Sequence, residues 1–319
     1  MRELKVTDRE EGLRLDKLLL RFMDGASTGF IYKMLRKKNI VLNGAKAKGD
    51  ERVKAGDVIK LFLSDDTISG FQKAKAAPVR IRSAFRPDII YEDENIIIAN
   101  KPAGMLSQKA KEDDISINEY LKDYCSAADV DEDILFTPSV CNRLDRNTSG
   151  IITFGKSLEG SRFLSELFRS RGLEKYYYAI CQGEAHESRL IEGYLLKDNE
   201  ENKVSVVNEN VPGATFIKTE YTPLSTGSGA TLMEIRLYTG KSHQIRAHLA
   251  STGYPIIGDR KYGIMRYSAK RQMLHAGRLV FPEGLEGSFE GLSGKVFRAN
   301  LPEDFAILTN KLFHDYIFE

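Results

Sequence analysis

Short apolar segments that resemble β-strands dominate the chain beyond residue 88, and their order constrains the fold more than any other feature. Seven segments fit strands by their β-branched and aromatic residues, at 89–91, 96–99, 151–154, 176–181, 203–207, 216–221 and 231–238. Helical patterns occur singly between them, at 116–124, 158–168 and 242–250. Because the segments lack a regular strand–helix–strand rhythm, the sequence predicts an α+β fold with a mixed, mostly antiparallel sheet.

Residues 1–64 form a separate pattern that predicts a small α/β module. Apolar residues recur at helical spacing, at Leu15, Leu18, Leu19 and Phe22. Ser27 or Thr28 can cap a second helix that continues to about residue 36. A short strand then enters an Asn-Gly turn at 43–44, a pair that tolerates positive φ, and a closing strand follows at 58–63.

Charge divides the chain near the end of this module. Residues 1–82 hold 19 Lys and Arg against 11 Asp and Glu, a net charge of +8. The remainder holds 28 against 34, a net charge of −6. Residues 65–84 show little periodicity and predict a linker to a large domain at 85–319. A basic module on an acidic body is typical of an appendage that binds a polyanion.

The module resembles the small RNA-binding domain named after a ribosomal small-subunit protein. The likeness rests on RLDK at 14–17, a basic second helix and the VLNG turn at 41–44. Four basic residues on or just after that helix are candidate contacts for RNA phosphates: Lys33, Arg36, Lys37 and Lys38. The alternative is an ordinary solvated helix face. We favour RNA because the resemblance and the charge asymmetry agree.

Composition indicates a cytoplasmic protein outside the membrane. No apolar run approaches the roughly 20 residues that span a bilayer, and the charged start of the chain lacks the apolar region of a signal peptide. Three widely spaced cysteines, Cys125, Cys141 and Cys181, fit reduced thiols and exclude a disulfide framework. We expect Cys141, although it is close to Asp145 in sequence, to be a packing thiol.

The most informative motif is RLDRNTSG at 143–150, directly before an apolar strand. It places Asp145 between Arg143 and Arg146, on a turn from which a carboxylate can reach a ligand. The two arginines favour the ionised form, which a carboxylate nucleophile needs. The alternative is a solvated Arg-Asp-Arg turn without chemistry. The complete string, together with motifs downstream, favours a catalytic carboxylate.

These motifs resemble those of the RluA-type RNA pseudouridine synthases. The string at 143–150 matches the family's RLDxxTSG, KYYYA at 175–179 matches its KxYxA element, and TGKSHQIRAHL at 239–249 matches TGRTHQIRxHL. The segment 89–104 and the LHA at 274–276 resemble its first and late blocks. Departures occur at Asn142, where His is common, at Asn147, where Asp is common, and at Lys241-Ser242, which replaces Arg-Thr.

The resemblance implies a pseudouridine synthase fold and an isomerase that converts uridine to pseudouridine in RNA, with Asp145 in the central role. An isomerisation of this kind needs no metal and no redox cofactor, so we expect neither. The module and the chain length are most similar to those of the enzymes that modify large-subunit ribosomal RNA. RNA is therefore the expected partner, and we expect a monomer. The motifs leave open whether Asp145 attacks the nucleoside or abstracts a sugar proton.

Arg246 is the predicted partner of Asp145, because a bidentate guanidinium would hold the carboxylate oriented and ionised. If Ser242 caps the helix that carries it, Ile245 and Leu249 lie on one face with Arg246 beside them. Ile245 then lies at the substrate. The alternative for Arg246 is an exposed surface position.

Tyr177 is the predicted aromatic contact for the uracil, because a flipped base needs a flat stacking surface and a polar group. Strand alternation places Tyr176 and Tyr178 on the opposite face. Thr148, in the hydroxyl pair of the motif, is a further candidate for substrate binding. His243 is a candidate for contact with RNA phosphate or, equally, for a structural role. Because His243 and His248 are five residues apart, the spacing disfavours a zinc site.

Two other functions remain as alternatives. The first is a non-catalytic RNA-binding or ribosome-assembly factor on a synthase fold, which the intact Asp145, Tyr177 and Arg246 disfavour. The second is a nucleoside hydrolase, which the absence of a metal-binding Asp cluster disfavours.

Overall fold

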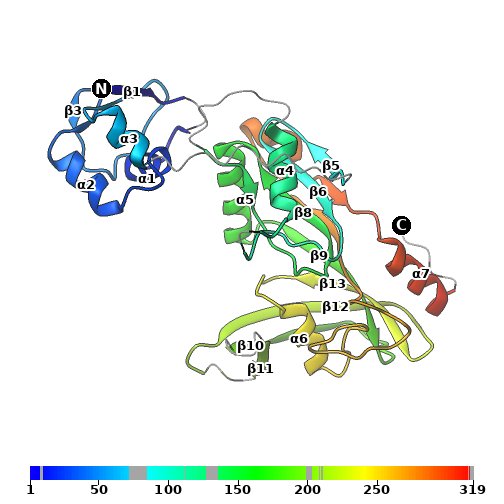
Figure 1. Ribbon diagram of the computed structural model, residues 1–319. Helices are drawn as coiled ribbons and strands as arrows, with labels where there is room; N and C mark the ends of the chain where they lie inside the picture. The colour runs from blue at the N-terminus through cyan, green and yellow to red at the C-terminus, as the bar shows by residue number, and fades with distance from the viewer. Residues whose placement is uncertain are drawn as a thin grey trace.

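The computed structural model describes residues 1–7, 10–71, 85–111, 113–126, 136–198, 203–207, 209, 211–314 and 316. It consists of a small N-terminal module and a large domain built on one long, twisted sheet (Figure 1). Among the helices of this described part, none combines the length and the apolar character needed to cross a membrane.

The N-terminal module confirms the predicted helices and turn. Helices α1 (Leu15–Phe22) and α2 (Thr28–Arg36) pack on a four-stranded antiparallel sheet of order β1-β4-β2-β3. The strands are β1 (Arg2–Lys5), β2 (Ile40–Leu42), β3 (Ala45–Lys46) and β4 (Val58–Leu61). Ser27 caps α2 by accepting a hydrogen bond from the Phe30 amide at 3.2 Å. Asn43 and Gly44 both have positive φ in the β2–β3 turn, as the Asn-Gly pair predicts.

The predicted linker begins too early, because residues 65–71 form helix α3 (Asp65–Phe71) of the module. Ser64 begins this helix by accepting a hydrogen bond from the Thr67 amide. Ile68 is completely buried in the module's core, and the Phe71 ring lies 4.4 Å from that of Phe30. A single buried residue in a short helix leaves too little periodicity to detect. The rest of the linker, 72–84, lies outside the described residues.

The large domain confirms the mixed α+β prediction. Its 11-stranded sheet has the order β11-β10-β12-β13-β9-β14-β8-β6-β5, with β15 paired to β14 and β7 paired to β8. All of these pairs are antiparallel except β14 with β8. The strands are β5 (Asp88–Glu92), β6 (Ile96–Lys101), β7 (Ser139–Val140), β8 (Ser149–Gly155), β9 (Glu174–Gln182), β10 (Arg189–Asp198), β11 (Lys203–Val207), β12 (Thr215–Gly227), β13 (Ala230–Leu237), β14 (Leu274–Val280) and β15 (Val296–Arg298).

In the described part of the large domain, four helices and a 3-10 turn accompany this sheet. They are α4 (Ile117–Ser126), α5 (Leu158–Ser170), α6 (Gln244–Ser251), η2 (Gly287–Leu292) and α7 (Glu303–Leu312). Residues of β6 alternate between two cores, as the strand period requires: Ile96 and Ile98 pack with Leu164 of α5, and Ile97 packs with Leu121 of α4. Both faces of the sheet are therefore covered at β6 and β8.

Only glycine fits at position 150, where β8 enters the sheet. Its φ is +111°, and a Cβ there would overlap the backbone carbonyl of Ala276 on the parallel strand β14. The glycine at the end of the RLDRNTSG motif therefore allows a close strand approach and fixes where the preceding loop ends.

Gly150→Ala is expected to lower the free energy of unfolding by about 2–5 kcal/mol, because it adds backbone strain and an overlap with main chain. Urea unfolding of the whole protein measures this. Gly70→Ala is the matched control, since Gly70 is helical and a Cβ there meets open space. It should be neutral or stabilise by up to about 1 kcal/mol. Equal effects of the two substitutions would contradict the close approach.

Candidate active site

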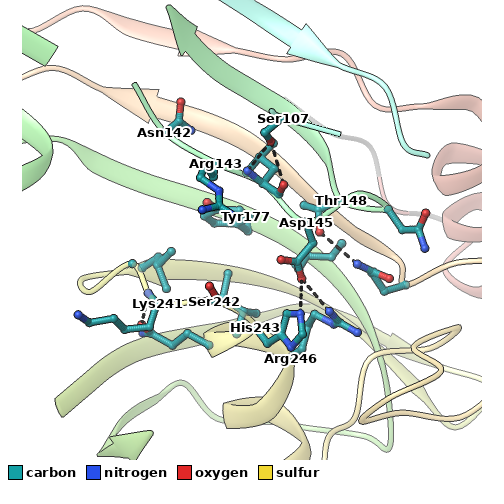
Figure 2. Close-up of a pocket in the computed structure, with 18 of the residues that line it drawn as sticks. Ser107, Asn142, Arg143, Asp145, Thr148, Tyr177, Lys241, Ser242, His243 and Arg246 are labelled. Carbon is teal, nitrogen blue, oxygen red and sulfur yellow. Dashed lines mark hydrogen bonds and ion pairs between the residues drawn. The ribbon is translucent and has the colours of Figure 1, made fainter. Parts of the chain in front are cut away.

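Eight residues predicted as site residues of the large domain line one cavity of about 940 Å³. They are Arg143, Asp145, Arg146, Thr148, Tyr177, His243, Ile245 and Arg246. They come from three places in the chain: the loop before β8, strand β9 and the start of α6. Figure 2 labels six of them, all but Arg146 and Ile245. The four predicted phosphate contacts, Lys33, Arg36, Lys37 and Lys38, lie apart from this cavity, exposed at the end of α2.

Asp145 lies on a tight turn between β7 and β8 that other segments hold in place. The Asp145 carbonyl accepts a hydrogen bond from the Thr148 amide at 3.0 Å, and the Arg146 carbonyl accepts one from the Gly104 amide at 2.9 Å. On the other side, Ser107 Oγ bonds both the amide and the carbonyl of Leu144, each at 2.9 Å. The main chain on both sides of Asp145 is thus fixed by the 104–107 segment.

Lys101 is a buried support beneath this turn, and its importance is not evident from the sequence. Its side chain is completely buried, and Nζ donates to the carbonyls of Pro102, Met105 and Arg146 at 2.9, 2.8 and 3.1 Å. Burial lowers the pKa of this ammonium to about 7, and the charge of Asp145 opposes the shift. One cation therefore joins the end of β6 to the turn that carries Asp145. The feature of the sequence that could have indicated a buried lysine is its position directly after the run Ile-Ile-Ile-Ala-Asn.

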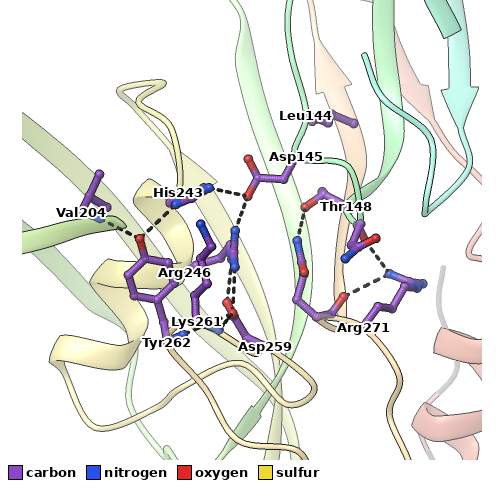
Figure 3. Close-up of polar contacts among 12 residues, drawn as sticks. Leu144, Asp145, Thr148, Val204, His243, Arg246, Asp259, Lys261, Tyr262 and Arg271 are labelled. Atoms are coloured by element: carbon purple, nitrogen blue, oxygen red, sulfur yellow. Dashed lines mark hydrogen bonds and ion pairs between the residues drawn. The ribbon is translucent and has the colours of Figure 1, made fainter. Parts of the chain in front are cut away.

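Arg246 reaches Asp145 from α6 across 101 positions of sequence. Its Nη1 lies 2.7 Å from Asp145 Oδ2, and the arginine side chain is only 7% exposed. The predicted bidentate contact exists, but with another residue: Nε and Nη2 lie 2.6 and 2.8 Å from the two carboxylate oxygens of Asp259 (Figure 3). Asp259 thus fixes the plane of the guanidinium, which leaves one edge for Asp145.

Asp259 is the residue of this network that the sequence analysis missed. Its side chain is fully buried, and its Oδ1 also accepts from the amides of Lys261 and Tyr262 at 2.9 and 3.3 Å. Burial by itself raises the pKa of Asp259, but the Arg246 guanidinium and these amides outweigh burial and lower it. Burial lowers the pKa of Arg246, and the two carboxylates outweigh it in the same way. Both groups of this pair are therefore charged.

Asp145 receives its cation partner, Arg246, from α6 and not from its neighbours in the motif. Among the residues that the structure describes, Asp145 pairs with Arg246 and lies 4.0 Å from His243 Nε2, whereas Arg143 and Arg146 are exposed. A strongly buried guanidinium interacts more strongly with a carboxylate than an exposed one does. Among the described residues, neither Arg143 nor Arg146, the expected partners from the motif, forms an ion pair with Asp145.

Helix α6 does not begin with the predicted Ser242 cap. His243 is the residue before the helix, with φ +58°, and Gln244 Oε1 instead accepts from the Lys241 amide at 3.1 Å. The condition that Ser242 caps this helix is therefore not met. Ile245 and Leu249 are both buried in the core, as the predicted helix face requires.

His243 adjoins the carboxylate and is held by a tyrosine. Its Nδ1 lies 3.0 Å from the Tyr262 hydroxyl, and its Nε2 lies 4.0 Å from Asp145 Oδ2 (Figure 3). Burial lowers the pKa of His243, Asp145 opposes this and Arg246 adds to it. His248, five positions on, is buried and bonds Thr219 at 2.9 Å. The two histidines thus have different partners.

Tyr177 lies on β9 with its ring in the cavity wall. Tyr176 and Tyr178 do not line the cavity, in agreement with the predicted alternation. Burial raises the pKa of Tyr177, and the charge of Asp145 raises it further. Its phenol is therefore protonated at neutral pH and available as a donor. Among the described residues it has no hydrogen-bond partner.

Residues 271–272 connect the turn at Asn147 and Thr148 with the C-terminal helix α7 through hydrogen bonds. Gln272 Nε2 donates to Thr148 Oγ1 at 3.4 Å, and Arg271 Nη1 donates to the Asn147 carbonyl at 3.2 Å. Arg271 is in turn held bidentately by Asp304 of α7, at 2.7 Å in both contacts. Like Asp259, these residues escaped the sequence analysis because their pairing exists only in the folded chain.

The chemistry available here is that of one oriented carboxylate beside a flat aromatic wall. The carboxylate is 26% exposed, so a ligand in the cavity can reach it, while its partner Arg246 is almost inaccessible. Within the ranges that the structure describes, no group of three or more His, Cys, Asp and Glu side chains is placed to hold a metal ion.

Burial raises the pKa of Cys141 to about 11, so this thiol is protonated at neutral pH, as a packing residue would be.

Comparison with known proteins identifies the family. The model of the RNA pseudouridylate synthase family matches residues 95–251. Ribosomal large subunit pseudouridine synthase C of Rickettsia bellii is 32% identical over 302 residues, which cover 89% of this chain and 94% of that protein. The chain belongs to the RNA pseudouridine synthase family. An uncharacterized RNA pseudouridine synthase of Mycoplasma genitalium is also 30% identical, over 87% of this chain and 88% of its own length.

Solved structures of pseudouridine synthases share the fold. Human RNA pseudouridylate synthase domain containing 4 aligns with a TM-score of 0.56 at 22% identity, over 70% of this chain and 93% of its own. Family members are isomerases, so the protein is an RNA-modifying enzyme, and the hydrolase alternative is excluded. The family match covers the segment that carries Asp145, Tyr177 and Arg246.

Proposed function

We propose that the protein isomerises uridines of large-subunit ribosomal RNA to pseudouridine, with Asp145 as the catalytic carboxylate. The observation that carries the proposal is the pair formed by Asp145 and Arg246. An accessible carboxylate is fixed at 2.7 Å from a guanidinium that is itself locked by buried Asp259. Preorganised charge of this kind is what a reaction with charge development at the sugar requires.

The reaction breaks the bond between uracil N1 and the sugar C1′ and forms a bond between C5 and C1′. C5 loses a proton and N1 gains one, so the overall composition is unchanged. Asp145 takes part either by attacking the nucleoside or by abstracting a sugar proton. Both roles need a carboxylate held in a fixed orientation, which the contact with Arg246 provides. The departing uracil stays in the cavity and must rotate there before it rejoins the sugar.

Tyr177 supplies the surface on which the extruded uracil stacks. Its ring lies in the cavity wall, and stacking on an aromatic side chain contributes about 1–3 kcal/mol per base. Its protonated hydroxyl, free of partners among the described residues, can donate to a uracil oxygen or move a proton. Thr148, Ile245 and His243 complete the walls near the carboxylate, and Arg143 and Arg146 face the RNA backbone at the mouth.

The choice of ribosomal RNA rests on the relatives and on the basic module. Relatives of about 30% identity over most of their length are named large-subunit enzymes. A module with a large excess of Lys and Arg adds affinity for a polyanion such as structured RNA.

The test is tritium release from RNA that carries tritium at C5 of uridine. Because C5 exchanges its hydrogen for the new glycosidic bond, each turnover releases one tritium to water. Purified protein should release tritium from large-subunit ribosomal RNA and not from small-subunit or transfer RNA. Release from transfer RNA alone would change the substrate class. RNA binding without release from any of them would mean a non-catalytic factor.

Tyr177→Phe is expected to bind this RNA within about twofold of wild type and to turn over about 100-fold more slowly, since only the hydroxyl is lost. Tyr177→Ala should weaken both binding and turnover. Single-turnover rates and RNA affinities measure these effects. The control is Tyr176→Phe, whose hydroxyl bonds Glu174 at 2.6 Å on the other face. A larger loss in Tyr176→Phe than in Tyr177→Phe would contradict the role of Tyr177.

A further inference from the structure

A second, strongly basic cleft lies between the N-terminal module and the large domain. It has a volume of about 480 Å³ and is lined by residues of α1, of the loop before β4 and of α5. Five of the lining residues are cationic: Arg14, Lys17, Arg21, Arg52 and Arg162. Figure 1 shows the module beside α5, the helix that contributes Arg162.

Two arginines from different parts of the fold are held close together at this cleft. Arg162 of α5 donates to the Glu11 carbonyl at 2.8 Å, and Arg52 of the module donates to the Gly12 carbonyl at 2.9 Å. Burial lowers the pKa of Arg162, and the charge of Arg52 lowers it further, while Glu11 opposes both. The two guanidinium groups repel each other, so bringing them together costs free energy unless an anion binds between them.

Nearby carboxylates offset only part of the charge of the cleft: Asp16 pairs with Arg14, and Glu11 acts on Arg162. Asp16 is engaged by Arg14 at 3.0 Å and by the Tyr32 hydroxyl. In the part of the chain that the structure describes, neither Lys17 nor Arg52 forms an ion pair. A guanidinium has five N–H donors, and the hydrogen bonds of Arg52 and Arg162 to main chain use one each. The remaining donors can bind phosphate oxygens, for which the planar guanidinium is well shaped.

Helix α5 lies close to both the cleft and the catalytic cavity. Helix α5 carries Arg162 near its start, and Arg171, directly after its end, lines the catalytic cavity together with Lys175. The two arginines are nine positions apart, a distance of about 14 Å along the helix axis. A short stretch of one RNA strand spans this distance.

We propose that the cleft formed by Lys17, Arg52 and Arg162 binds backbone phosphates of the RNA whose uridine enters the catalytic cavity. The inference rests on the proposed function only for the identity of this RNA. It moves the main phosphate contact of the module from the end of α2 to α1. It also gives α5 a role, because a phosphate held by Arg52 and Arg162 together fixes the module against the large domain.

The test is the affinity of the full-length protein for a large-subunit RNA fragment across a salt series. Arg162→Gln and Lys17→Gln should each reduce the magnitude of the log K versus log salt slope by about 0.7–0.9 and weaken binding about five- to eightfold at 0.1 M salt. Lys17 is exposed, so its loss does not endanger folding. Arg169→Gln is the matched control, since Arg169 lies on α5 outside both cavities, in an exposed pair with Glu166.

Reduced slopes for the two cleft variants and an unchanged slope for the control would support the cleft. Unchanged slopes for both cleft variants would overturn it, and a protein partner would then be the better occupant. An equal reduction in the control would also overturn it, since any lost charge would suffice. RNA affinity and tritium release are measured separately. The cleft can therefore be ruled out while isomerase activity is observed, and loss of isomerase activity can be observed while the cleft still binds RNA.

Discussion

Asp145→Asn should lower the rate of pseudouridine formation by more than about a thousandfold, a loss of roughly 4 kcal/mol in transition-state stabilisation. The amide can neither attack the nucleoside nor accept a sugar proton at neutral pH. The fold should survive, because Asn retains an oxygen for the Arg246 Nη1 contact and Arg246 keeps its bidentate partner Asp259. Single-turnover tritium release measures the rate.

Circular dichroism and RNA affinity are the controls for this substitution, and both should match wild type closely. A rate within tenfold of wild type, with the fold intact, would remove Asp145 from the chemistry. Asn142→Ala is a useful comparison from the same loop, because Asn142 bonds the Thr153 amide and hydroxyl at 2.7 and 3.0 Å. It should reduce stability more than turnover.

Arg246→Met should reduce activity far more than Arg143→Met or Arg146→Met and should destabilise the protein by about 3–5 kcal/mol. Removing one partner of a buried pair leaves the charge of Asp259 uncompensated, whereas an exposed ion pair contributes about 0–1 kcal/mol. Urea unfolding and single-turnover rates measure the two effects. Equal and small losses for all three arginines would remove Arg246 from the site.

The destabilisation of Arg246→Met should depend on pH in a defined direction. In wild type the pKa of Asp259 is lowered, so its contribution to stability is present above its unfolded pKa and is lost as pH falls. Without Arg246, burial raises the pKa of Asp259, and the folded variant gains stability as pH falls toward about 4. The stability difference from wild type should therefore shrink by about 1 kcal/mol or more between pH 8 and pH 5.

A double variant, Arg246→Met with Asp259→Asn, separates stability from catalysis. Removing both charges should recover much of the lost stability and abolish its extra pH dependence, because no buried carboxylate remains unpaired. Activity should stay low, since Asp145 still lacks its cation. Recovery of activity along with stability would show that Arg246 acts only on the fold.

Local patterns predicted the parts of the fold that depend on local interactions. The helical spacing that ends at Phe22, the Ser27 cap and the Asn43-Gly44 turn all have the predicted structure. Strands β7, β10, β14 and β15 of the large sheet were missed. Half of β14 is Leu-His-Ala-Gly, which lacks strand character by itself and forms a strand because β8 and β9 flank it. Its placement is a tertiary effect.

The site, too, has residues that the sequence identifies and residues that only the folded chain reveals. Asp145, Tyr177 and Arg246 were identifiable because their motifs resemble those of a known family. Their supports were not, because nothing near Lys101 or Asp259 in the sequence predicts three carbonyl acceptors or a buried guanidinium. A buried charge with no local partner is a useful signal for such residues, since burial is tolerated only when a partner exists elsewhere in the chain.

Pseudouridine mapping of ribosomal RNA from cells is the most direct test of the central claim, that Asp145 of this protein forms pseudouridine in the large subunit. Three strains are compared: one with the gene intact, one with it deleted, and one in which the Asp145→Asn form replaces wild type at equal abundance. Specific large-subunit pseudouridines should be present in the first strain and absent from the other two. Their presence in the strain with Asp145→Asn would contradict the account.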